Sequence, residues 1–537
     1  MSRTDRSVSS SRGSRVRSAG PLRRTSALLL AATLGALGPG IVPLPAAAQD
    51  TGYAVPPPLA GEPVPSDGGV PDKPYRQETG CVQRDLSQDV VLQNAPWGQQ
   101  YLRLAEVHQL MQNTTGSIGR FADSGQPVQV AVIDTGVNNH PYFQGRVKPG
   151  GDYVANKGQP GMEDCDGHGT EVAGIIAANT PSNLGFKGMA PDVEIISIRQ
   201  SSQNYEFDEE TDGQNQPPPS GDGNGGDNGD GGEGGNEGEN GGGSGAGDPQ
   251  TDPAQDGGGR TQEEAGSAGT LDTLAQAVVN ATNRGVDVVN ISINNCRPAG
   301  PITSGERALQ AAVANAVAND IVVVSAAGNT SEACPQNEGD PNNPSTIVTP
   351  PWFADDVLSV GAIDQTGGVA EFSVHGPWVS VAAPGTDIIS LDPAQGSDRL
   401  ANMTIENGDP QKIQGTSFAA PYVAGLAALV RAKYPDLNAE QVINRITTTA
   451  QHPAAPGGRD NFVGYGVIDP MAALTATVPE EEGMAPASAV ALPSDMPPPN
   501  DQSSTPMIVA LAGSGGALMA LLITLFVVHT IRRNRTA

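Results

Sequence analysis

Short apolar runs that alternate with helix-forming segments restrict the fold more than any other feature of this sequence. Runs rich in Val and Ile cover residues 128–134, 193–198, 286–293, 321–326 and 357–362. Segments of helical character cover residues 168–178, 271–283, 306–318, 419–433 and 439–449. Strands that are apolar on both faces belong to sheets that helices cover on both sides. We therefore predict an α/β fold in which a mostly parallel sheet lies between two helical layers.

Composition limits how much of the 537 residues can join this core, because Gly (68) and Pro (46) are abundant and aromatic residues make up only 4%. Residues 201–266 contain 16 Asp or Glu, one Arg and many Gly. We predict a disordered acidic insertion there; the calcium-binding alternative lacks the spacing of an EF-hand loop. A net charge of −29 argues against nucleic-acid binding.

The N-terminal segment has the three parts of a secretory signal. Residues 3–24 are basic, Leu28–Leu37 is apolar, and Ala46–Ala48 forms an A-x-A cleavage site. We predict that residues 1–48 are a signal peptide, with general secretory or twin-arginine export both open because of the Arg pair before the apolar run.

The C-terminal segment has the character of a membrane anchor. Residues 507–531 carry no charge over a length that spans a bilayer, and residues 532–537 contain three Arg. The positive-inside rule predicts a cytoplasmic basic tail and a folded body outside the membrane. Residues 477–506 form a Pro-rich linker, and residues 49–96 form a Pro-rich N-terminal arm without regular structure. The remaining span, 97–476, is the predicted folded domain.

Three polar residues stand where predicted strands end or helices begin. Asp134 ends the run VAVIDTGV, His168 opens DGHGTEVAGIIA, and Ser417 opens the helix in GTSFAAPYVAGLAALV. Active sites of parallel sheets lie at the carboxyl ends of the strands. A Ser hydroxyl becomes nucleophilic when a His accepts its proton and a carboxylate orients that His. Glycines flank all three and permit close backbone approach: Gly136, Gly167, Gly169 and Gly415.

The motifs DTG, HGT and GTS-x-A-x-P, in this order, resemble those of subtilisin-like serine proteases. The resemblance implies a subtilisin-like three-layer fold in which Asp134 is the orienting acid, His168 the general base and Ser417 the nucleophile. A fourth motif, SAAGN, implies that Asn329 is the side-chain donor of the oxyanion hole. No zinc motif is present, and we expect neither a metal nor a cofactor.

The substrate-binding edge departs from ordinary subtilisins. Their Ser-Leu-Gly-Gly turn is replaced by Ser-Ile-Asn-Asn at residues 292–295. We expect substrate contacts here and beside the oxyanion motif, and we expect two Asn side chains to narrow the cleft: the predicted substrate-binding residues are Ser292, Ile293, Asn294, Ala327 and Gly328.

Four cysteines in an exported protein favour two disulfides, and three pairings are possible. We favour Cys296–Cys334, because both follow strands that leave the same edge of the sheet. We also favour Cys81–Cys165, which ties the N-terminal arm beside His168.

The signal peptide, tethered arm, acidic insertion, linker and C-terminal helix together resemble the mycosins, the membrane-anchored subtilisins of actinobacterial type VII secretion systems. The resemblance implies a serine endopeptidase that cleaves secreted proteins in or beside the secretion complex. It also implies an arm that wraps the protease. Two alternatives remain: a structural component of the complex in which proteolysis is secondary, and a broad-specificity surface protease.

Overall fold

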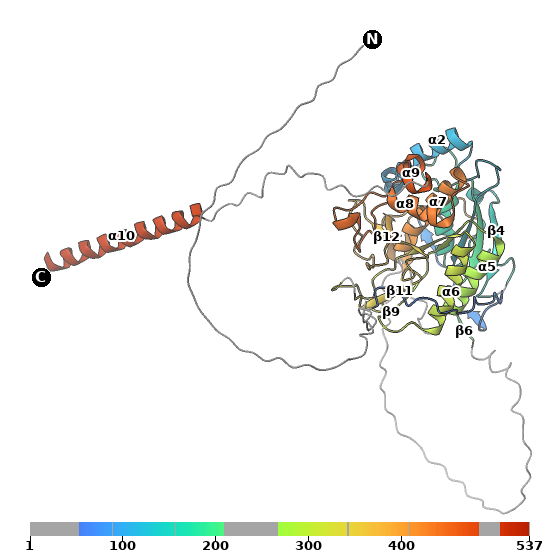
Figure 1. Cartoon of the computed structure of the whole chain (residues 1–537), viewed down its shortest axis with the longest axis horizontal. Helices are drawn as coiled ribbons and strands as arrows, with labels where there is room; N and C mark the ends of the chain where they lie inside the picture. The colour runs from blue at the N-terminus through green and yellow to red at the C-terminus, as the bar shows by residue number, and fades with distance from the viewer. Residues whose placement is uncertain are drawn as a thin grey trace, which may run out of the picture. The chain divides into compact units, whose positions relative to one another are not determined.

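The computed structural model describes seven stretches of the chain, which are coloured in Figure 1: residues 53–87, 90–155, 157–208, 267–340, 343–406, 409–482 and 505–535. The predicted signal peptide lies outside these residues. Residues 209–266 of the acidic insertion and residues 483–504 of the linker also lie outside them.

A seven-stranded sheet forms the centre of the fold, and every pair of neighbouring strands in it is parallel. The strands follow the spatial order β13-β12-β10-β8-β3-β5-β4. Their bounds are β3 (Gln129–Asp134), β4 (Val147–Asp152), β5 (Glu194–Arg199), β8 (Val288–Ile291), β10 (Val322–Ala326), β12 (Leu358–Ile363) and β13 (Val381–Pro384).

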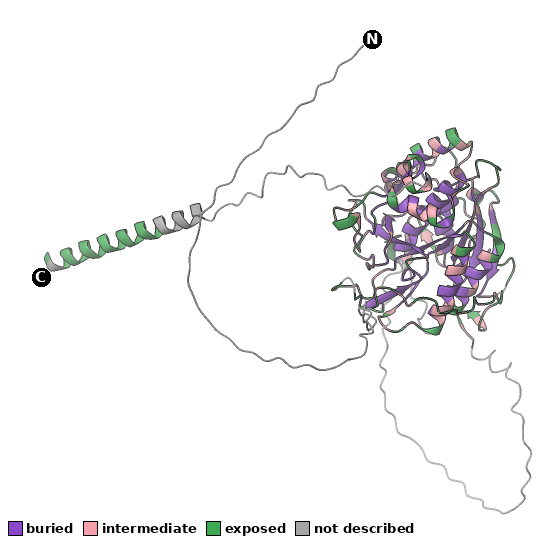
Figure 2. Cartoon of the chain, in the orientation of Figure 1, coloured by how far each residue is buried: buried purple, intermediate pink, exposed green. Residues whose placement is uncertain are grey.

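Both faces of the sheet are buried, which explains the unbroken apolar runs (Figure 2). Alternate residues of β3 face opposite sides: Val130 and Val132 join one core cluster, and Ala131 and Ile133 join the other. The first cluster lies under α2 (Leu104–Thr115), α3 (His168–Ala177), α7 (Thr416–Lys433), α8 (Ala439–Thr448) and α9 (Pro470–Thr475). The second lies under α5 (Leu271–Arg284) and α6 (Ser304–Ala318). The three-layer α/β prediction is confirmed.

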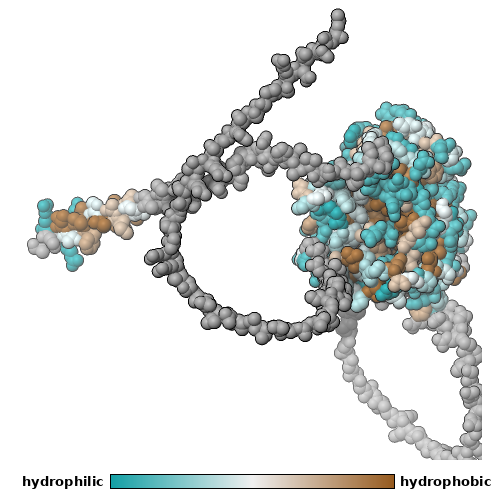
Figure 3. Space-filling view, viewed as in Figure 1, coloured by the Kyte–Doolittle hydropathy of each residue, from teal (hydrophilic) through white to brown (hydrophobic). Residues whose placement is uncertain are grey.

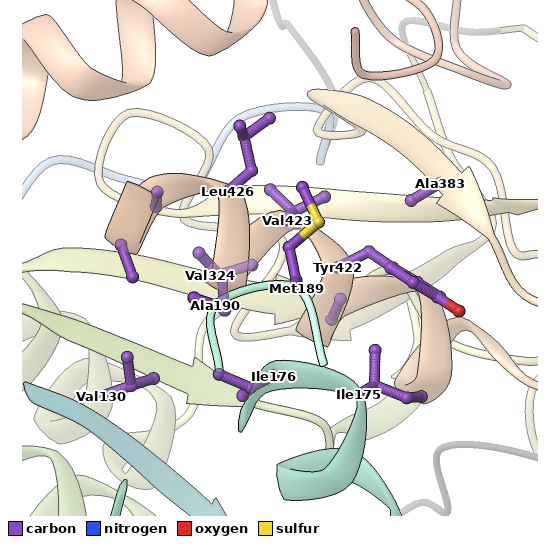
Figure 4. Packing of buried hydrophobic residues seen from close by; sticks show 14 of the residues in the cluster. Val130, Ile175, Ile176, Met189, Ala190, Val324, Ala383, Tyr422, Val423 and Leu426 are labelled. Atoms are coloured by element: carbon purple, nitrogen blue, oxygen red, sulfur yellow. The ribbon is translucent and has the colours of Figure 1, made fainter. Parts of the chain in front are cut away.

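Helix α7 is the most deeply buried helix of the first layer, with 17 of its 18 residues buried. Its side chains Val423 and Leu426 belong to the same buried cluster as Ile175 and Ile176 of α3 and Val324 of β10 (Figure 4). A helix that is apolar on all sides must be enclosed, so α7 fixes the distance between α3 and the sheet. The helices that carry two of the three candidate catalytic residues therefore pack directly against each other.

The N-terminal arm is more ordered than its composition predicts. Strand β1 (Tyr75–Gln77) pairs antiparallel with β6 (Ser202–Phe207), which pairs with β7 (Ser267–Ala268). Upstream of β1, the backbone N–H of Gly68 donates to Gln276 of α5, and Gln310 of α6 donates to the Pro57 carbonyl. The arm therefore lies along the second helical layer.

The predicted start of the acidic insertion at residue 201 is wrong, because β6 belongs to the fold. Tyr205 is buried in a small cluster with Val154 and Ala268, and the backbone of β6 pairs with β1. The segment Ser202–Phe207 is polar and has no clear apolar alternation, so it could not be separated by composition from the acidic residues that follow.

A second part of the arm adds a strand elsewhere. Strand β2 (Arg84–Asp85) pairs with β16 (Met403–Glu406), which pairs with β17 (Asp409–Lys412). The remaining elements are α1 (Trp97–Tyr101), β9 (Asn295–Pro298) paired with β11 (Thr346–Thr349), β14 (Ser390–Leu391) paired with β15 (Leu400–Ala401), and 3₁₀ turns at Pro141–Phe143, Pro456–Gly458 and Pro479–Glu482.

Both disulfides have the pairing favoured by the sequence. Cys81 is bonded to Cys165 across 84 residues, and Cys296 of β9 is bonded to Cys334 in the loop after β10. The first disulfide closes a long loop that contains the end of the arm and β3. Chain-entropy estimates assign such a loop roughly 4–5 kcal/mol of stabilisation.

One C-terminal helix, α10 (Thr505–Arg535), is apolar enough to cross a membrane. The candidate span is Ser514–Arg533, with a mean hydropathy of 1.9 and no part of it buried by the protein. The brown residues of this helix in Figure 3 are accordingly exposed. The helix extends beyond the predicted bounds of 507–531 and includes the Arg residues of the predicted tail.

We predict that His108 of α2 makes the fold sensitive to acid. Burial lowers the pKa of His108 to about 4 from its ordinary value of 6.5. Between these values the unfolded chain binds more protons than the folded chain, so the free energy of unfolding falls as the pH drops from about 6.5 to 4. The expected contribution is about 1–3 kcal/mol. Chemical unfolding across this window should show a shallower pH dependence for His108→Gln.

The matched control is His452→Gln, which makes the same substitution at an exposed position and so measures the effect of the substitution itself. A His108→Gln variant with the pH dependence of the unmodified protein would contradict the prediction. The Gln amide can still donate to the Met189 carbonyl, which contacts His108 Nε2 at 3.0 Å.

Candidate active site

Asp134, His168 and Ser417 occupy one edge of the central sheet. Asp134 is the last residue of β3, His168 is the first residue of α3, and Ser417 is the second residue of α7. The His168 ring lies 5.0 Å from the ring of Phe418, the residue after Ser417. The fold thus gathers the three residues that the motifs singled out.

The contact between Asp134 and His168 is direct. His168 Nδ1 lies 2.7 Å from Asp134 Oδ1, and the backbone N–H of Thr135 donates to the same oxygen at 2.8 Å. Asp134 is fully buried, whereas the His168 side chain is partly open to solvent. The hydrogen bond orients the imidazole and directs its Nε2 atom away from the carboxylate.

Two glycines make this contact possible. A Cβ atom on Gly169 would lie 2.0 Å from the Gly136 carbonyl oxygen and 3.1 Å from Asp134 Cβ. A Cβ atom on Gly136 would lie 2.1 Å from the Glu163 carbonyl oxygen, and its φ of +105° also favours glycine. The first turn of α3 therefore rests on the loop after β3, and any side chain at these positions would move His168 away.

Asp164 is a buried carboxylate of this site that sequence reasoning missed. It accepts hydrogen bonds from the Thr135 hydroxyl, the Gly167 N–H, and both the N–H and hydroxyl of Thr170. Burial raises the pKa of the Asp164 carboxyl, while the hydrogen bonds oppose that shift. Asp164 joins the loop before His168 to the loop after Asp134. The only sequence signal for this role was the position of Asp164 four residues before His168.

The backbone carbonyl of Ser417 accepts a hydrogen bond from outside its own helix. Pro421 has no N–H, so the Ser417 carbonyl lacks the donor that an α-helix would supply four residues later. The Ser292 hydroxyl donates to that carbonyl at 2.9 Å, and Asn290 Nδ2 donates to the Ser292 oxygen at 2.8 Å. The buried Ser417 Oγ makes no hydrogen bond to the described residues. The backbone of Ser417 is thus fixed by a hydrogen bond, whereas its hydroxyl remains available for reaction.

Asn329 is oriented by the residue before Ser417. Its Oδ1 atom accepts from the Thr416 N–H at 3.0 Å and from the Thr416 hydroxyl at 2.9 Å. The Thr416 hydroxyl also accepts from the Gly328 N–H at 3.2 Å. Asn329 Nδ2 is buried and has no hydrogen-bond partner among the described residues. Thr416 was not singled out from the sequence, although it lies inside the GTS motif.

The predicted substrate-binding residues divide into two groups. Ser292, Ala327 and Gly328 already have structural hydrogen bonds: the first to Ser417, the second from its N–H to Val360, and the third to Thr416. Ile293 and Asn294 lie in the turn between β8 and β9 and are both buried. Neither amide atom of Asn294 has a hydrogen-bond partner among the described residues.

The histidines outside the motifs have ordinary partners. A ring nitrogen of His108, His140, His375 and His452 lies at hydrogen-bond distance from a backbone carbonyl. Within the stretches that the structure describes, no group of three or more His, Cys, Asp or Glu residues could hold a metal ion.

Comparison with known proteins identifies the family. Residues 125–466 match the subtilase family. Mycosin-1 of Mycobacterium tuberculosis (strain ATCC 25618 / H37Rv) is 39% identical over 472 residues, covering 86% of this chain and 91% of that protein. The chain belongs to the mycosins, within the subtilase family. It is a serine endopeptidase, as the motifs predicted.

Solved mycosin structures share this fold. The crystal structure of MycP1 from Mycobacterium smegmatis has a TM-score of 0.62 and 36% identity, and covers 82% of this chain and 99% of its own. A chain in the structure of an intact ESX-5 inner membrane complex has a TM-score of 0.62 and 38% identity, and covers 87% of this chain and 97% of its own. The predicted resemblance to mycosins is confirmed.

We predict that Thr416→Val lowers activity while the fold persists. Valine keeps the volume of threonine but removes the hydroxyl that joins the Gly328 N–H to Asn329 Oδ1. Loss of one such bond costs about 1–2 kcal/mol, which corresponds to about a tenfold decrease in kcat. Peptide hydrolysis at saturating substrate measures the effect.

Thr416→Ser retains the hydroxyl and is the matched control, with kcat expected near that of the unmodified protein. Equal activity of the Val and Ser variants would show that the hydroxyl does not orient Asn329.

Proposed function

We propose that Asp134, His168 and Ser417 are the catalytic triad of a membrane-anchored endopeptidase that cleaves secreted proteins beside a type VII secretion complex. The observation that carries the proposal is the 2.7 Å contact of a buried carboxylate with His168. The His168 ring also contacts Phe418, the residue after Ser417, whose hydroxyl has no hydrogen-bond partner among the described residues. This is the arrangement that acyl transfer by a serine hydroxyl requires.

Each residue has a defined part in the reaction. Ser417 Oγ attacks the scissile carbonyl carbon while His168 Nε2 accepts the hydroxyl proton, and Asp134 stabilises the imidazolium that forms. His168 then gives that proton to the leaving amine, and the C–N bond breaks to leave an acyl-enzyme. A water molecule repeats the sequence, loses its proton to His168, and releases the carboxylic acid product with Ser417 restored.

The oxyanion has two candidate donors. Asn329 Nδ2 is buried without a partner among the described residues, because Thr416 occupies the other end of the same amide. The Ser417 N–H lies in the first turn of α7, where backbone N–H groups have no acceptor within the helix. Donors that are already desolvated and fixed stabilise developing charge without reorganisation.

The turn at residues 292–295 supports selective rather than digestive cleavage. Asn294 is fully buried and Asn295 nearly so, in a turn where ordinary subtilisins carry glycines. Their unpartnered amide atoms add desolvated polar groups beside the bound substrate. Such groups disfavour apolar substrate side chains that cannot satisfy them.

We infer the location of the protease from the sequence of α10. Its apolar span ends in Arg532, Arg533 and Arg535, and positive residues flank the cytoplasmic side of membrane helices. We therefore place the C-terminal end of α10 in the cytoplasm and the protease outside the membrane. The similar chain in the ESX-5 inner membrane complex supports association with such a complex.

A structural role is the second candidate function, and the same similarity favours it. A protein that fills a fixed place in a membrane complex can stabilise that complex without cleaving anything. The two roles differ in what they require of Ser417: proteolysis needs its hydroxyl, whereas assembly needs only the folded chain.

We predict that a fluorophosphonate labels Ser417 in the unmodified protein and fails to label Ser417→Ala. Asp134→Asn should keep the fold and lower kcat by about 10⁴-fold, because the amide holds His168 in the wrong tautomer. Labelling followed by peptide mapping identifies the modified residue. Labelling of Ser417→Ala at the rate of the unmodified protein would contradict the assignment of the nucleophile.

The Ser417→Ala variant also separates the two functions. Expressed in a strain that lacks this gene, it should restore an intact membrane complex but leave secreted substrates uncleaved if both roles hold. Restored cleavage would contradict the proposed triad, and an absent complex despite a folded variant would contradict a purely structural role.

We predict that Asn294→Gly broadens specificity. Removing the buried amide opens the turn and removes its desolvation cost, so kcat/KM for substrates with a large apolar side chain before the scissile bond should rise about tenfold. A peptide library that varies only that position measures the change. Gln144→Gly is the control and should leave the preference unchanged, because Gln144 has a positive φ at the end of the 3₁₀ turn Pro141–Phe143 and is not part of the turn 292–295.

A further inference from the structure

A short part of the N-terminal arm contacts both the helix that begins at His168 and the hairpin that precedes Ser417. This arm segment, residues 81–87, begins at Cys81, which is disulfide-bonded to Cys165. Cys165 lies three residues before His168. The Val82 N–H donates to the Cys165 carbonyl at 2.9 Å, which adds a backbone contact to the covalent one. The arm segment then continues into β2, whose partner strand β16 leads towards Ser417.

Arg84 is the residue of the arm segment that reaches both sides. Arg84 Nε lies 2.7 Å from Glu171 Oε1, and Arg84 Nη2 lies 3.1 Å from the Asp166 carbonyl oxygen. Arg84 Nη1 donates to the Thr404 hydroxyl at 2.9 Å. All three guanidinium nitrogens therefore have protein partners, on segments that are far apart in the sequence.

On the histidine side, Glu171 lies one turn after His168 in α3. Its side chain has no exposed surface, and that of Arg84 is 5% exposed. Burial raises the pKa of the Glu171 carboxyl, and the charge of Arg84 opposes that shift. Within the described part of the chain, the only ion pair of Glu171 is with Arg84. The helix that carries His168 thus takes its buried counter-charge from the N-terminal arm.

On the serine side, Thr404 belongs to β16, which pairs with β2 in the register Thr404↔Arg84 and Met403↔Asp85. The Asn402 N–H donates to the Asp85 carbonyl at 3.1 Å, and the Ile413 N–H donates to the Asn402 carbonyl at 3.1 Å. Ile413 stands four residues before Ser417. The hairpin that precedes the nucleophile is therefore in direct contact with the arm segment.

We propose that Arg84 is a positioning residue, which fixes the start of α3 relative to the hairpin before Ser417. The inference rests on the proposed triad, because its effect is the placement of His168 against Ser417. Arginine suits the role because its planar fork donates in several fixed directions, whereas a lysine ammonium is a single point charge on a flexible stem. The N-terminal arm then helps to set the geometry of the active site.

The test compares variants of the full-length, detergent-solubilised protein by kcat, KM, the rate of fluorophosphonate labelling, and Tm. For Arg84→Gln we expect kcat and the labelling rate to fall by at least about tenfold together, with KM within about twofold. Arg84→Lys should recover only part of kcat. The control is Arg76→Gln on the same arm, whose partner Glu78 is 37% exposed, and it should change none of these values.

The double variant Arg84→Gln/Glu171→Gln separates positioning from charge compensation. It removes the unpaired buried carboxylate, so Tm should recover, but kcat should stay low because the link to Thr404 is still absent. Recovery of kcat together with Tm would overturn the proposal, and so would an Arg84→Gln variant with normal kcat.

Thr404→Val keeps the proposal testable even if Arg84→Gln does not fold. It removes only the contact on the serine side and leaves the Arg84–Glu171 pair intact, so kcat should fall several-fold with little change in Tm. Unchanged kcat in Thr404→Val would overturn the proposal. Failure of the triad itself is distinguishable, because the unmodified protein would then not be labelled at Ser417.

Discussion

The hydrogen bond between Asp134 and His168 depends on how closely α3 can approach the end of β3. The carboxylate is buried and would be costly without a donor. Besides the Thr135 N–H, its partner is His168, the first residue of a helix whose second residue must be Gly169. A Cβ atom on Gly169 would lie 2.0 Å from the Gly136 carbonyl oxygen. Helix α7 is buried on all sides, and its packing against α3 holds α3 in this position. Packing of the core and alignment of the site are therefore one constraint.

Hydrogen bonds around the start of α7 position the remaining reactive groups. Pro421 leaves the Ser417 carbonyl without a helical donor, and Ser292 takes that place. Thr416 binds one end of the Asn329 amide and leaves the other end as a donor. The Ser417 carbonyl and the Asn329 Oδ1 atom therefore have hydrogen-bond donors. The Ser417 hydroxyl and the Asn329 Nδ2 atom are buried and have no partner among the described residues. Preorganisation here comes from incomplete hydrogen bonding at chosen atoms.

Local patterns predicted five of the seven strands of the sheet, the helices α3, α5, α6, α7 and α8, and the three motif residues, because each is encoded within a short stretch of sequence. The two edge strands were not predicted, because β4 contains Pro and two Gly and β13 has only four residues. The helices α2 and α9 were not predicted either. Residues that act through distant partners could not be predicted this way. Arg84 and Thr404 are 320 positions apart, and neither lies in a recognisable motif. The strand β6 was missed for a related reason, since its partner β1 lies in a Pro-rich arm that composition describes as unstructured. Composition averages over a segment, whereas pairing depends on individual residues.

The boundary between arm and protease domain at residue 97 is therefore compositional, not structural. A buried ion pair such as Arg84–Glu171 is weak evidence for added stability, because desolvation offsets much of the attraction. The ion pair instead constrains geometry, because the buried carboxylate of Glu171 is paired only when Arg84 lies at one position along α3. The Cys81–Cys165 disulfide holds Arg84 near that position. An apolar contact would tolerate sliding of the arm segment along α3. The polar contact does not, and it extends the same restriction to the hairpin before Ser417.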